Sequence, residues 1–520
     1  MSSIFRKLQV KKPKQSRFNL SHEVKLSCNF GELIPILCQE ALPGDVFASK
    51  SQIFTRFAPL LAPVMHRINV YTHYFFVPNR LIWDEWEDFI TGGDDMAASP
   101  VHPYFLLTDS YMVPKGSLFD YLGLPTGVKG LGKVSSLPFR AYNLIFNEWY
   151  RDQNLQKELA VNKSSGQEAH TGPYSQVAHR CWEKDYFTSA LPFAQKGGDV
   201  HISAGESAPV VLSNTEKMQS WVTYNGDRAA AGDASFSQRG TGAPIDKIST
   251  LNASDGARTY LDPNGTLKAD LSNSKGTTIN QLRDATRLQE FLEIAARAGS
   301  RFKEQLFAHF GVMSKDSRLD RPELIGGGSS NVVISDVPQT SQSTDTSAQA
   351  TLAGNALSFQ ENNGFKYKCA EHGFIIGIMS VLPRTAYQQG INKMFLRDDK
   401  FDYAFPVFAN LGEQPILNKE LYVSGAADDD EVFGYTPRYA EYKYQPSRVC
   451  GDMRDNLSFW HLGRQFKDRP TLSSKFVECD HKNLSRIFAV EDEKEDKLWV
   501  QIYNDVRAIR KLPYFGTPQL

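Results

Sequence analysis

The clearest nucleotide-like spacing in this 520-residue chain is Gly127–Lys133, which matches the G-x-x-x-x-G-K pattern of a phosphate-binding loop. The residue that follows, Val134, has no hydroxyl to offer a bound magnesium ion. Pro138 also stands where a phosphate-binding helix should begin. We therefore interpret Gly127–Val134 as a glycine-rich connecting loop and expect no nucleotide cofactor.

Two groups of histidine and cysteine that fall close together in the sequence are candidate metal ligands: His170, His179 and Cys181, and His461, Cys479 and His481. Neither group has the ligand spacing of a zinc finger. The acidic run Asp428–Glu431 could offer oxygens to a hard cation, but it lacks the alternating ligands and central glycine of a calcium loop. We interpret the run as a solvated loop or as a partner for arginines across an interface. No metal site is predicted.

Catalysis has no candidate constellation, because the chain contains neither H-E-x-x-H nor G-x-S-x-G. The net charge is -1, from 58 Lys and Arg against 59 Asp and Glu, so polyanion binding would have to be local. The local imbalance lies in residues 1–17, which carry no acidic residue and six cations: Arg6, Lys7, Lys11, Lys12, Lys14 and Arg17. This arm is either a polyanion contact or a solvated, frayed terminus.

The first residues, MSSIFRKLQVKK, lack the apolar segment of a signal peptide, and the longest apolar run, Phe374–Leu382, is half the length of a bilayer helix. We therefore expect a protein that is made and folded in the cytosol. The six cysteines form no C-x-x-C pair, which predicts reduced core residues rather than a disulfide framework.

Short runs of β-branched and aromatic residues, separated by Pro and Gly turns, predict a mainly β fold. In His66–Pro78, apolar residues alternate on one face while aromatics occupy part of the other, which predicts a strand covered on both sides. Further strands are predicted at 365–368, 374–382, 441–444 and 498–503. Strands so distant in sequence must share sheets, which favours a sandwich or jelly roll over a parallel α/β sheet.

Helices are predicted between these strands. One covers 82–90 and ends at Thr91-Gly92-Gly93, and a second places Tyr142, Ile145, Phe146, Trp149 and Tyr150 on one stripe. The strongest begins at a Thr278 capping box and turns six apolar residues inward: Ile279, Leu282, Leu288, Phe291, Leu292 and Ala295. We expect it to kink or stop near Gly299, after which Phe302, Leu306 and Phe310 continue the stripe.

Composition divides the chain into parts. The stretch 197–276 is rich in Gly, Ala, Ser, Asn and Asp and predicts a long exposed insertion. A second loop is predicted at 326–349, with a hinge at Gly326–Ser330. The predicted organisation is a basic arm (1–17), a first part of the sandwich domain with short helices (18–196), the insertion (197–277), and a helix with the remaining strands (278–520).

Several ordered motifs resemble one known family. They are the run Phe54–Arg67 with its continuation Tyr74–Arg80 and Phe89–Gly93, Ala295–Arg301, His309–Val312, Ser335–Ser341, Tyr387–Gly390, Leu411–Pro415, Asp429–Tyr435 and Arg438–Tyr442. Their types and order are similar to the major capsid proteins of the Microviridae, specifically the gokushovirus branch of bacteriophages. The weakest match is the stretch 197–276 and the extreme C-terminus.

The resemblance implies an eight-stranded antiparallel jelly roll with large loop and helical insertions. It implies a structural protein of the virion that assembles with copies of itself, in the host cytoplasm, into a small icosahedral (T=1) shell around circular single-stranded DNA. Other implied partners are a small basic DNA-binding virion protein, an internal scaffolding protein and a bacterial receptor. The implied DNA contact is the basic arm. No enzymatic activity, cofactor or membrane insertion is implied.

The resemblance also implies that the insertion protrudes from the shell and meets the host, and the residues we select for that contact are Asp227, Arg228, Ser237 and Arg239. The remaining alternatives are a glycan-binding jelly-roll module and a carbohydrate-active enzyme on a β-sandwich. A lectin should show a compact cluster of aromatic and carboxylate side chains, and an enzyme should show paired carboxylates in a cleft.

Overall fold

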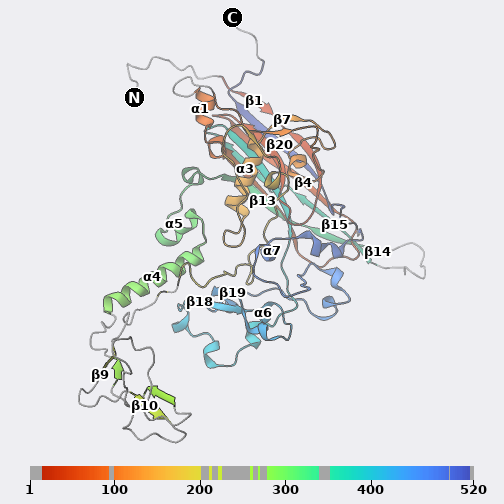
Figure 1. Cartoon of the computed structure of the whole chain (residues 1–520). Coiled ribbons are helices and arrows are strands. Elements are labelled where there is room, and N and C mark those ends of the chain that lie inside the picture. The colour runs from red at the N-terminus through yellow and green to blue at the C-terminus, as the bar shows by residue number, and fades with distance from the viewer. Residues whose placement is uncertain are drawn as a thin grey trace, which may run out of the picture. The chain divides into compact units, whose positions relative to one another are not determined.

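The structure is a computed structural model that describes residues 14–92, 99–198, 200, 278–338, 352–490, 492 and 494–515, together with four short strands between 210 and 269. The chain divides into two compact units, one made of residues 1–196 and 293–520 and the other of residues 197–292. Figure 1 traces the elements of both.

One large antiparallel sheet dominates the first unit, and β1, β20, β4, β16, β13, β5, β17 and β3 follow one another across it. β2 pairs with β20, and β15 joins β4 to β14. The strands of this sheet are β1 (Ser16–Asn19), β2 (His22–Cys28), β3 (Ile34–Ala41), β4 (Val46–Phe57), β5 (Ile68–Pro78), β13 (Glu323–Asn331), β14 (Val333–Pro338), β15 (Leu352–Gln360), β16 (Gly364–Lys368), β17 (Gly373–Pro383) and β20 (Leu498–Arg510).

The sheet curls until its two halves face each other. β2, β20, β4 and β16 form one half, β13, β5, β17 and β3 form the other, and a single pair, Gly326 with Phe365, links β13 to β16. Most neighbours in this order are far apart in the sequence, as in the twelve-residue pairing of β4 with β20. β15 extends the first half beyond β4, and β1 and β14 are the remaining strands of this eleven-stranded sheet. Two facing antiparallel halves are the arrangement of the predicted jelly-roll sandwich.

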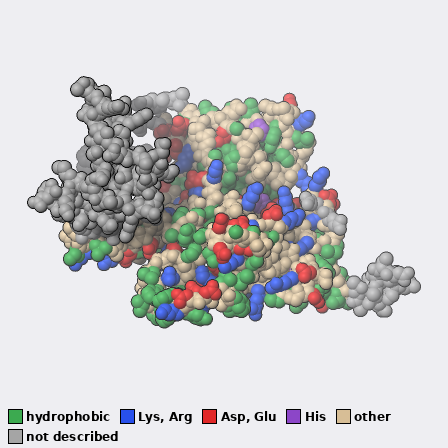
Figure 2. All heavy atoms as spheres, turned by 60° about the horizontal axis from the view of Figure 1, so that its bottom comes forward, with side chains coloured by type: hydrophobic (Ala, Val, Ile, Leu, Met, Phe, Trp, Pro, Cys, Tyr) green, Lys and Arg blue, Asp and Glu red, His purple; other side chains and the backbone are tan. Residues whose placement is uncertain are grey.

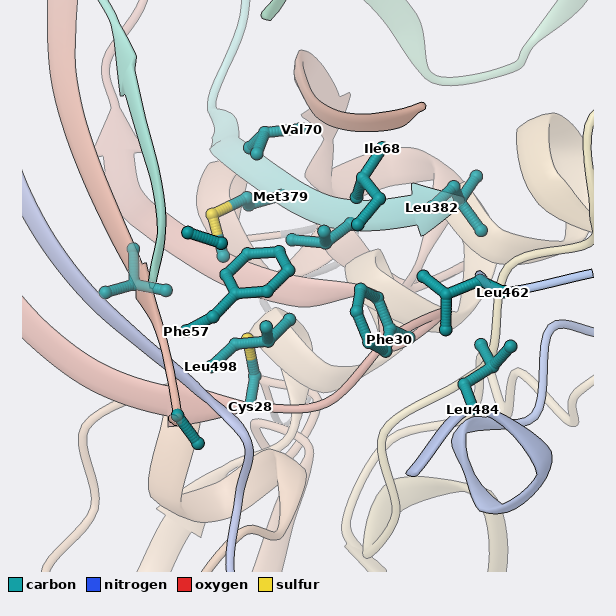
Figure 3. Close-up of a cluster of buried hydrophobic side chains, with 14 of the residues drawn as sticks. Cys28, Phe30, Phe57, Ile68, Val70, Met379, Leu382, Leu462, Leu484 and Leu498 are labelled. Carbon is teal, nitrogen blue, oxygen red and sulfur yellow. The ribbon is translucent and has the colours of Figure 1, made fainter. Parts of the chain in front are cut away.

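The space between the two halves is filled by a hydrophobic core. Ile53 and Phe57 from β4 and Leu498 from β20 meet Val70 from β5 and Met379 from β17. Figure 3 shows Phe57, Leu498, Val70 and Met379 converging with Phe30, whose ring centroid lies 5.6 Å from that of Phe57. Every second residue of β4 and β20 is buried on the inner side of the sandwich, in this core or in a second cluster that includes Phe47 and Val506, and the residues between them point outward. The alternation explains why these sequences form half-buried strands.

The second half of the sheet is covered on its outer face as well. Phe75 and Val77 of β5 and Ile376 of β17 pack in a separate cluster with Tyr142 of α3 (Leu137–Ile145). The prediction of a strand covered on both sides at 66–78 is therefore confirmed. In the other half, the outward residues of β20 and β4 are mostly exposed, so the two halves differ in what covers them.

Smaller elements complete the chain. The remaining strands are β6 (Tyr104–Leu107), β7 (Gly132–Ser135), β8 (Gln167–Glu168), β9 (Val210–Leu212), β10 (Trp221–Tyr224), β11 (Arg258–Leu261), β12 (Leu267–Ala269), β18 (Glu413–Leu417) and β19 (Val432–Pro437). The other α-helices are α1 (Trp86–Thr91), α2 (Leu118–Tyr121), α4 (Ile279–Ala298), α5 (Phe302–Phe310), α6 (Asn418–Leu421) and α7 (Ser474–Val477). Among the described residues no helix is long and apolar enough to cross a bilayer.

Two predicted elements are wrong. The loop predicted at 326–349 is occupied by β13 and β14 as far as residue 338, beyond which the predicted loop lies outside the described residues, and Gly326–Ser330 is not a hinge but the middle of β13, paired with β5. A Cβ on Gly328 would lie 2.1 Å from the carbonyl oxygen of Asn362, so glycine is required there by a close approach of backbones. The predicted strand at 441–444 is instead a 3-10 turn, η9 (Ala440–Tyr442), entered by Tyr439 in the left-handed region at φ 60°.

The helix predictions are partly right. The first helix is shorter than predicted: it starts at Trp86 and ends at Gly92, whose φ is 88°. The second is α3, which does begin beside Pro138, because proline is tolerated in the first turn, where the backbone N–H has no helical partner. Gly127–Val134 forms no phosphate-binding loop before a helix, and its last residues start β7 instead.

None of the six cysteines, all in described residues, forms a disulfide. Cys28, Cys369 and Cys479 are buried as predicted, and burial raises the pKa of the Cys369 thiol to about 12. Cys38 and Cys450 are exposed, which corrects the prediction that all six belong to the core.

Two partly buried histidines predict how stability depends on pH. Desolvation lowers the pKa of His66 and of His73 to about 4, from a usual value of 6.5. As the pH falls below 6.5 the unfolded chain binds these protons first, so stability is complete above that pH and is lost between 6.5 and 4.

We expect His73→Gln to remove part of this loss, up to about 3 kcal/mol for a shift of this size. The Nδ1 atom of His73 lies 2.9 Å from the hydroxyl of Tyr150, a contact that the Gln amide can replace. The measurement is the unfolding midpoint of both proteins between pH 4 and 7.5. Parallel curves for the two proteins would show that His73 does not contribute.

Candidate assembly surface

The basic arm lies only in part within the described residues. Lys14 is exposed, and Arg17 projects from the edge strand β1, where it pairs with Ile509 of β20. Arg6, Lys7, Lys11 and Lys12 lie outside the described residues. The four residues selected for host contact, Asp227, Arg228, Ser237 and Arg239, also lie outside them.

Helix α4 begins and ends as predicted, but most of the apolar stripe that was predicted to be buried is exposed. The capping box at its start is confirmed, since the Thr278 N–H donates to Gln281 Oε1 at 2.9 Å and the Gln281 N–H donates to Thr278 Oγ1 at 3.2 Å. Its end before Gly299 is confirmed too. However, Ile279, Leu282, Leu288 and Phe291 are exposed. An amphipathic pattern identifies an apolar stripe, but the partner that buries it need not belong to the same chain.

A larger exposed apolar area lies in residues 391–444. We call it the aromatic surface and define it by nine side chains: Met394, Phe395, Phe401, Tyr403, Phe405, Val407, Leu411, Tyr442 and Tyr444. Phe395 is 71% and Val407 83% exposed. Figure 2 looks onto the side that carries β18, β19 and α6, and shows hydrophobic side chains exposed among charged ones. Monomeric proteins rarely expose so many large apolar side chains in one region, so this surface is a candidate interface.

The aromatic surface is held by short 3-10 turns and by side-chain contacts. Asp402 accepts hydrogen bonds from the N–H groups of Asp398 and Asp399, both at 2.9 Å, which fixes the turn η6 (Lys400–Asp402). The guanidinium of Arg397 lies over the rings of Tyr403 and Tyr442, at 4.9 and 4.5 Å from their centroids. These contacts hold the exposed rings in place before any partner binds, which lowers the entropy cost of an interface.

The acidic run beside this surface is paired within the chain. Asp428 and Asp429 both bind Arg469, with 2.6 Å between Arg469 Nη2 and Asp429 Oδ1, and Asp430 binds Lys419. Arginine is therefore the partner of this run, but an arginine of the same chain. The idea that Asp428–Asp430 reach across an interface is not supported.

Two of the residues considered for chemistry, His461 and Cys181, make structural hydrogen bonds, and the rings of His179 and His481 stack with their centroids 6.3 Å apart. His461 accepts the Gly463 N–H at Nδ1, 2.9 Å away, while its Nε2 lies 2.7 Å from the Met453 carbonyl oxygen. Cys181 donates to Gln156 Oε1 at 3.2 Å, and burial raises the pKa of its thiol to about 12. Among the described residues, no group of three or more His, Cys, Asp and Glu could hold a metal ion.

A cavity of about 200 Å³ next to the aromatic surface is the place where paired carboxylates of a hydrolase could lie. Its two carboxylates are already paired: Glu420 with Lys393 at 3.4 Å, and Glu441 with Arg397 at 3.8 Å. Glu420 also accepts a hydrogen bond from Tyr186 at 2.9 Å. A glycosidase needs one of its two carboxyl groups to bind or release a proton, which cation pairing opposes. The carbohydrate-active alternative is not supported.

Sequence reasoning missed the aromatic surface. The segment 393–411 is rich in Phe and Tyr but has neither a period of two nor one of 3.6, so nothing in it distinguishes exposed rings from buried ones. The only signal was the aromatic content of 12%, which indicated interfaces without locating them.

A β-sandwich that exposes many large aromatic and aliphatic side chains in one region has the features of a structural protein that assembles with other subunits. The chain belongs to the capsid protein (F protein) family, whose model matches residues 7–520. It is therefore a phage capsid protein, part of the virion and not an enzyme, and the resemblance to gokushovirus capsids is confirmed.

Three relatives are similar over nearly the whole chain. The capsid protein VP1 of Bdellovibrio phage phiMH2K is 38% identical and covers 97% of this chain and 95% of its own. VP1 of Chlamydia phage 1 is 36% identical, with coverage of 98% and 96%. VP1 of Spiroplasma virus 4 is 33% identical, with coverage of 97% and 95%. The glycan-binding alternative receives no support from these relatives.

Proposed function

We propose that this capsid protein closes into an icosahedral shell around single-stranded DNA, with the aromatic surface buried between neighbouring copies and the basic arm facing the genome. The observation that supports the assembly role is the set of preformed, exposed rings in residues 391–444. Subunits related by rotation meet through different patches of their surfaces, and such contacts close into rings. Once a ring is nearly complete the last contact is intramolecular, so contacts that are weak one by one become strong together.

The arm is proposed as the DNA contact because it concentrates six cations in 17 residues of a chain whose net charge is -1. Lys14 and Arg17, its described members, are exposed. Binding of this kind depends on release of counterions and weakens with salt, by a log–log slope of about 0.7 per phosphate contacted.

Replacing Arg6, Lys7, Lys11, Lys12, Lys14 and Arg17 by Ser should leave shells forming while reducing the DNA that they enclose. The measurement is the ratio of absorbance at 260 and 280 nm in purified particles, checked by extraction of the DNA. A control variant replaces six exposed cations that the proposal does not use. Unchanged DNA content in the arm variant would exclude the arm as the principal DNA contact. The proposed small basic virion protein would then be expected to make that contact.

The insertion is proposed as the part that meets the bacterial host, through residues that include Asp227, Arg228, Ser237 and Arg239. Residues 197–292 form a compact unit of their own, which supports a segment that can vary without disturbing the sandwich. Deletion of residues 200–275 should preserve assembly and reduce adsorption to host cells at least tenfold. Particles are counted by electron microscopy and adsorption by depletion of free phage. Loss of assembly would instead place this segment in the shell itself.

We also propose two further partners, an internal scaffolding protein and a receptor on the bacterial surface. An internal scaffold would hold subunits at the correct curvature before the aromatic surfaces close. Its contribution is measured by comparing assembly of this chain alone with assembly in the presence of the other structural proteins of its phage.

A further inference from the structure

The outward face of the half-sheet β2, β20, β4, β15 and β16 carries an unusual set of side chains. We call it the open sheet face. On most half-exposed strands the outward positions are polar. Here four of them are aromatic: Trp499 and Tyr503 on β20, Phe54 on β4 and Phe359 on β15. Trp499 is 47% and Phe359 58% exposed.

The rings form a connected row. Trp499 and Tyr503 are four residues apart on one strand, which separates them by about 13 Å. Phe54 is paired with Gln501 between them, so it is a diagonal neighbour of both, and Phe359 is paired with Phe54 on its other side. The result is a path of flat, apolar surfaces across three strands.

Cations surround this row. They are Lys25 on β2, Lys50 and Arg56 on β4, Lys366 and Lys368 on β16, and Arg507 on β20, and all six are exposed. Arg56 is paired directly with Trp499, and its guanidinium lies 5.7 Å from the centroid of Phe54. Within the described part of the chain, Lys50, Lys366 and Lys368 form no ion pair within 4.0 Å.

Two carboxylates on the face pair with two of these six cations, which leaves four described cations, Lys50, Arg56, Lys366 and Lys368, outside any ion pair. Glu23 lies 3.4 Å from Lys25, and Asp505 lies 3.3 Å from Arg507. A third, Glu361, lies at the edge and accepts a hydrogen bond from Gln52 at 3.1 Å. The face is therefore locally positive in a chain that is neutral as a whole. Its cationic end is continuous with Arg17 of the arm, because β1 pairs with the same strand, β20.

We infer that the open sheet face binds single-stranded DNA, with bases stacked on Trp499, Tyr503 and Phe54 and phosphates held by the surrounding lysines and Arg56. This inference rests on the proposed function, that the shell encloses a single-stranded genome, and adds a second contact to the arm. Single-stranded nucleic acid is the ligand that this chemistry fits, since every unpaired base offers a π-face and every linkage an anion. A duplex fits less well, because its bases are stacked on one another and cannot stack on these rings. A second copy of the chain fits less well, because lysine is depleted in the cores of protein interfaces.

The test uses the full-length chain below its assembly concentration and a fluorescent dT16 oligonucleotide. The double variant Trp499→Ala/Tyr503→Ala should bind dT16 at least about 30-fold more weakly, as expected for the loss of two stacked bases. The matched control, Phe395→Ala/Phe401→Ala, removes two exposed rings from the aromatic surface and should bind dT16 like the parent. Trp499→Phe should keep most of the affinity and lose the quenching of tryptophan fluorescence that dT16 causes in the parent.

The charges are tested separately. The triple variant Lys50→Ser/Lys366→Ser/Lys368→Ser should lower the log–log salt slope of dT16 binding by about 2, whereas Lys129→Ser/Lys157→Ser/Lys163→Ser, which changes three exposed lysines elsewhere, should not. The inference would be overturned if Trp499→Ala/Tyr503→Ala bound dT16 with the affinity of the parent, or if the parent itself did not bind dT16. If face variants fail to assemble but bind dT16 normally, the face is a subunit contact and the inference is wrong. The proposed function fails separately, if parent particles contain no DNA.

Discussion

Replacing Arg140 by Leu is expected to lower the free energy of unfolding by about 3–5 kcal/mol. Arg140 is fully buried in α3. Its Nε donates to Glu168 at 3.0 Å, and its two terminal nitrogens donate to the carbonyl oxygens of Ile82 and Ser164 at 3.0 and 2.9 Å. One side chain thus joins three segments that cover the outer face of β5 and β17. Its loss would leave the buried Glu168 carboxylate without a cationic partner.

The measurement is guanidinium-induced unfolding of the unassembled chain. The double variant Arg140→Leu/Glu168→Leu removes both charges and should recover a large part of the loss, because the cost comes mainly from the unpaired carboxylate. As a control, Arg287→Ala breaks an ion pair whose side chains are 79% and 53% exposed and should cost less than about 1 kcal/mol. A loss of less than 1 kcal/mol for Arg140→Leu would contradict the structural role assigned to it.

The triple variant Phe395→Ser/Phe401→Ser/Val407→Ser should raise the protein concentration needed for particle formation by about 100-fold or more. Each of these side chains is at least half exposed in the isolated chain. Truncating an apolar anchor at the centre of an interface costs on the order of 1–2 kcal/mol or more, and 1.4 kcal/mol is a tenfold change in affinity. Because every copy uses the same surface, the loss recurs at each contact in the shell.

Light scattering against protein concentration measures this threshold. The control replaces three other exposed apolar residues of the sandwich unit, Val101, Met112 and Val128, by Ser. Both variants should unfold at the same temperature as the parent, since none of the six side chains is buried. An unchanged threshold in the aromatic variant would show that assembly uses other surfaces.

Strand positions could be predicted from the sequence where one face of a strand is buried. In β20 the alternation of Leu498, Val500 and Ile502 with polar or aromatic neighbours identifies both the strand and its inward face. β5 was identified because its aromatic residues continue on the second face. Pairing partners could not be predicted, because β4 and β20 are separated by more than 400 residues and no local signal specifies which distant strand will lie beside which.

The errors have physical causes as well. The composition of Gly326–Ser330 predicts a flexible segment. In the structure its glycines lie where the backbones of β5 and of the loop after β15 come too close to β13 to leave room for a side chain. The apolar stripe of α4 was read as a core-facing stripe, because hydrophobic periodicity identifies the stripe and not its partner. In a protein that assembles with other subunits, a periodic apolar stripe can be buried against a neighbouring subunit instead of in the core of its own chain.

The candidate sites differ in how far the sequence identifies them. The basic arm was recognised from charge alone, because six cations without an acid in 17 residues is a local signal. The open sheet face could not be recognised, because Lys25, Phe54, Lys366 and Trp499 lie in four distant segments that only the sheet register brings together. The aromatic surface could be identified only from the exposed fraction of each of its side chains in the structure.

The central claim is that this chain acts by assembly through its exposed aromatic side chains, and a particle reconstruction at side-chain resolution tests it most directly. The chain is produced together with the other structural proteins of its phage, and the particles are imaged by electron microscopy. We predict closed shells in which Phe395, Phe401 and Val407 are buried between neighbouring copies. Shells in which these side chains face solvent, or only isolated chains at high concentration, would contradict the account.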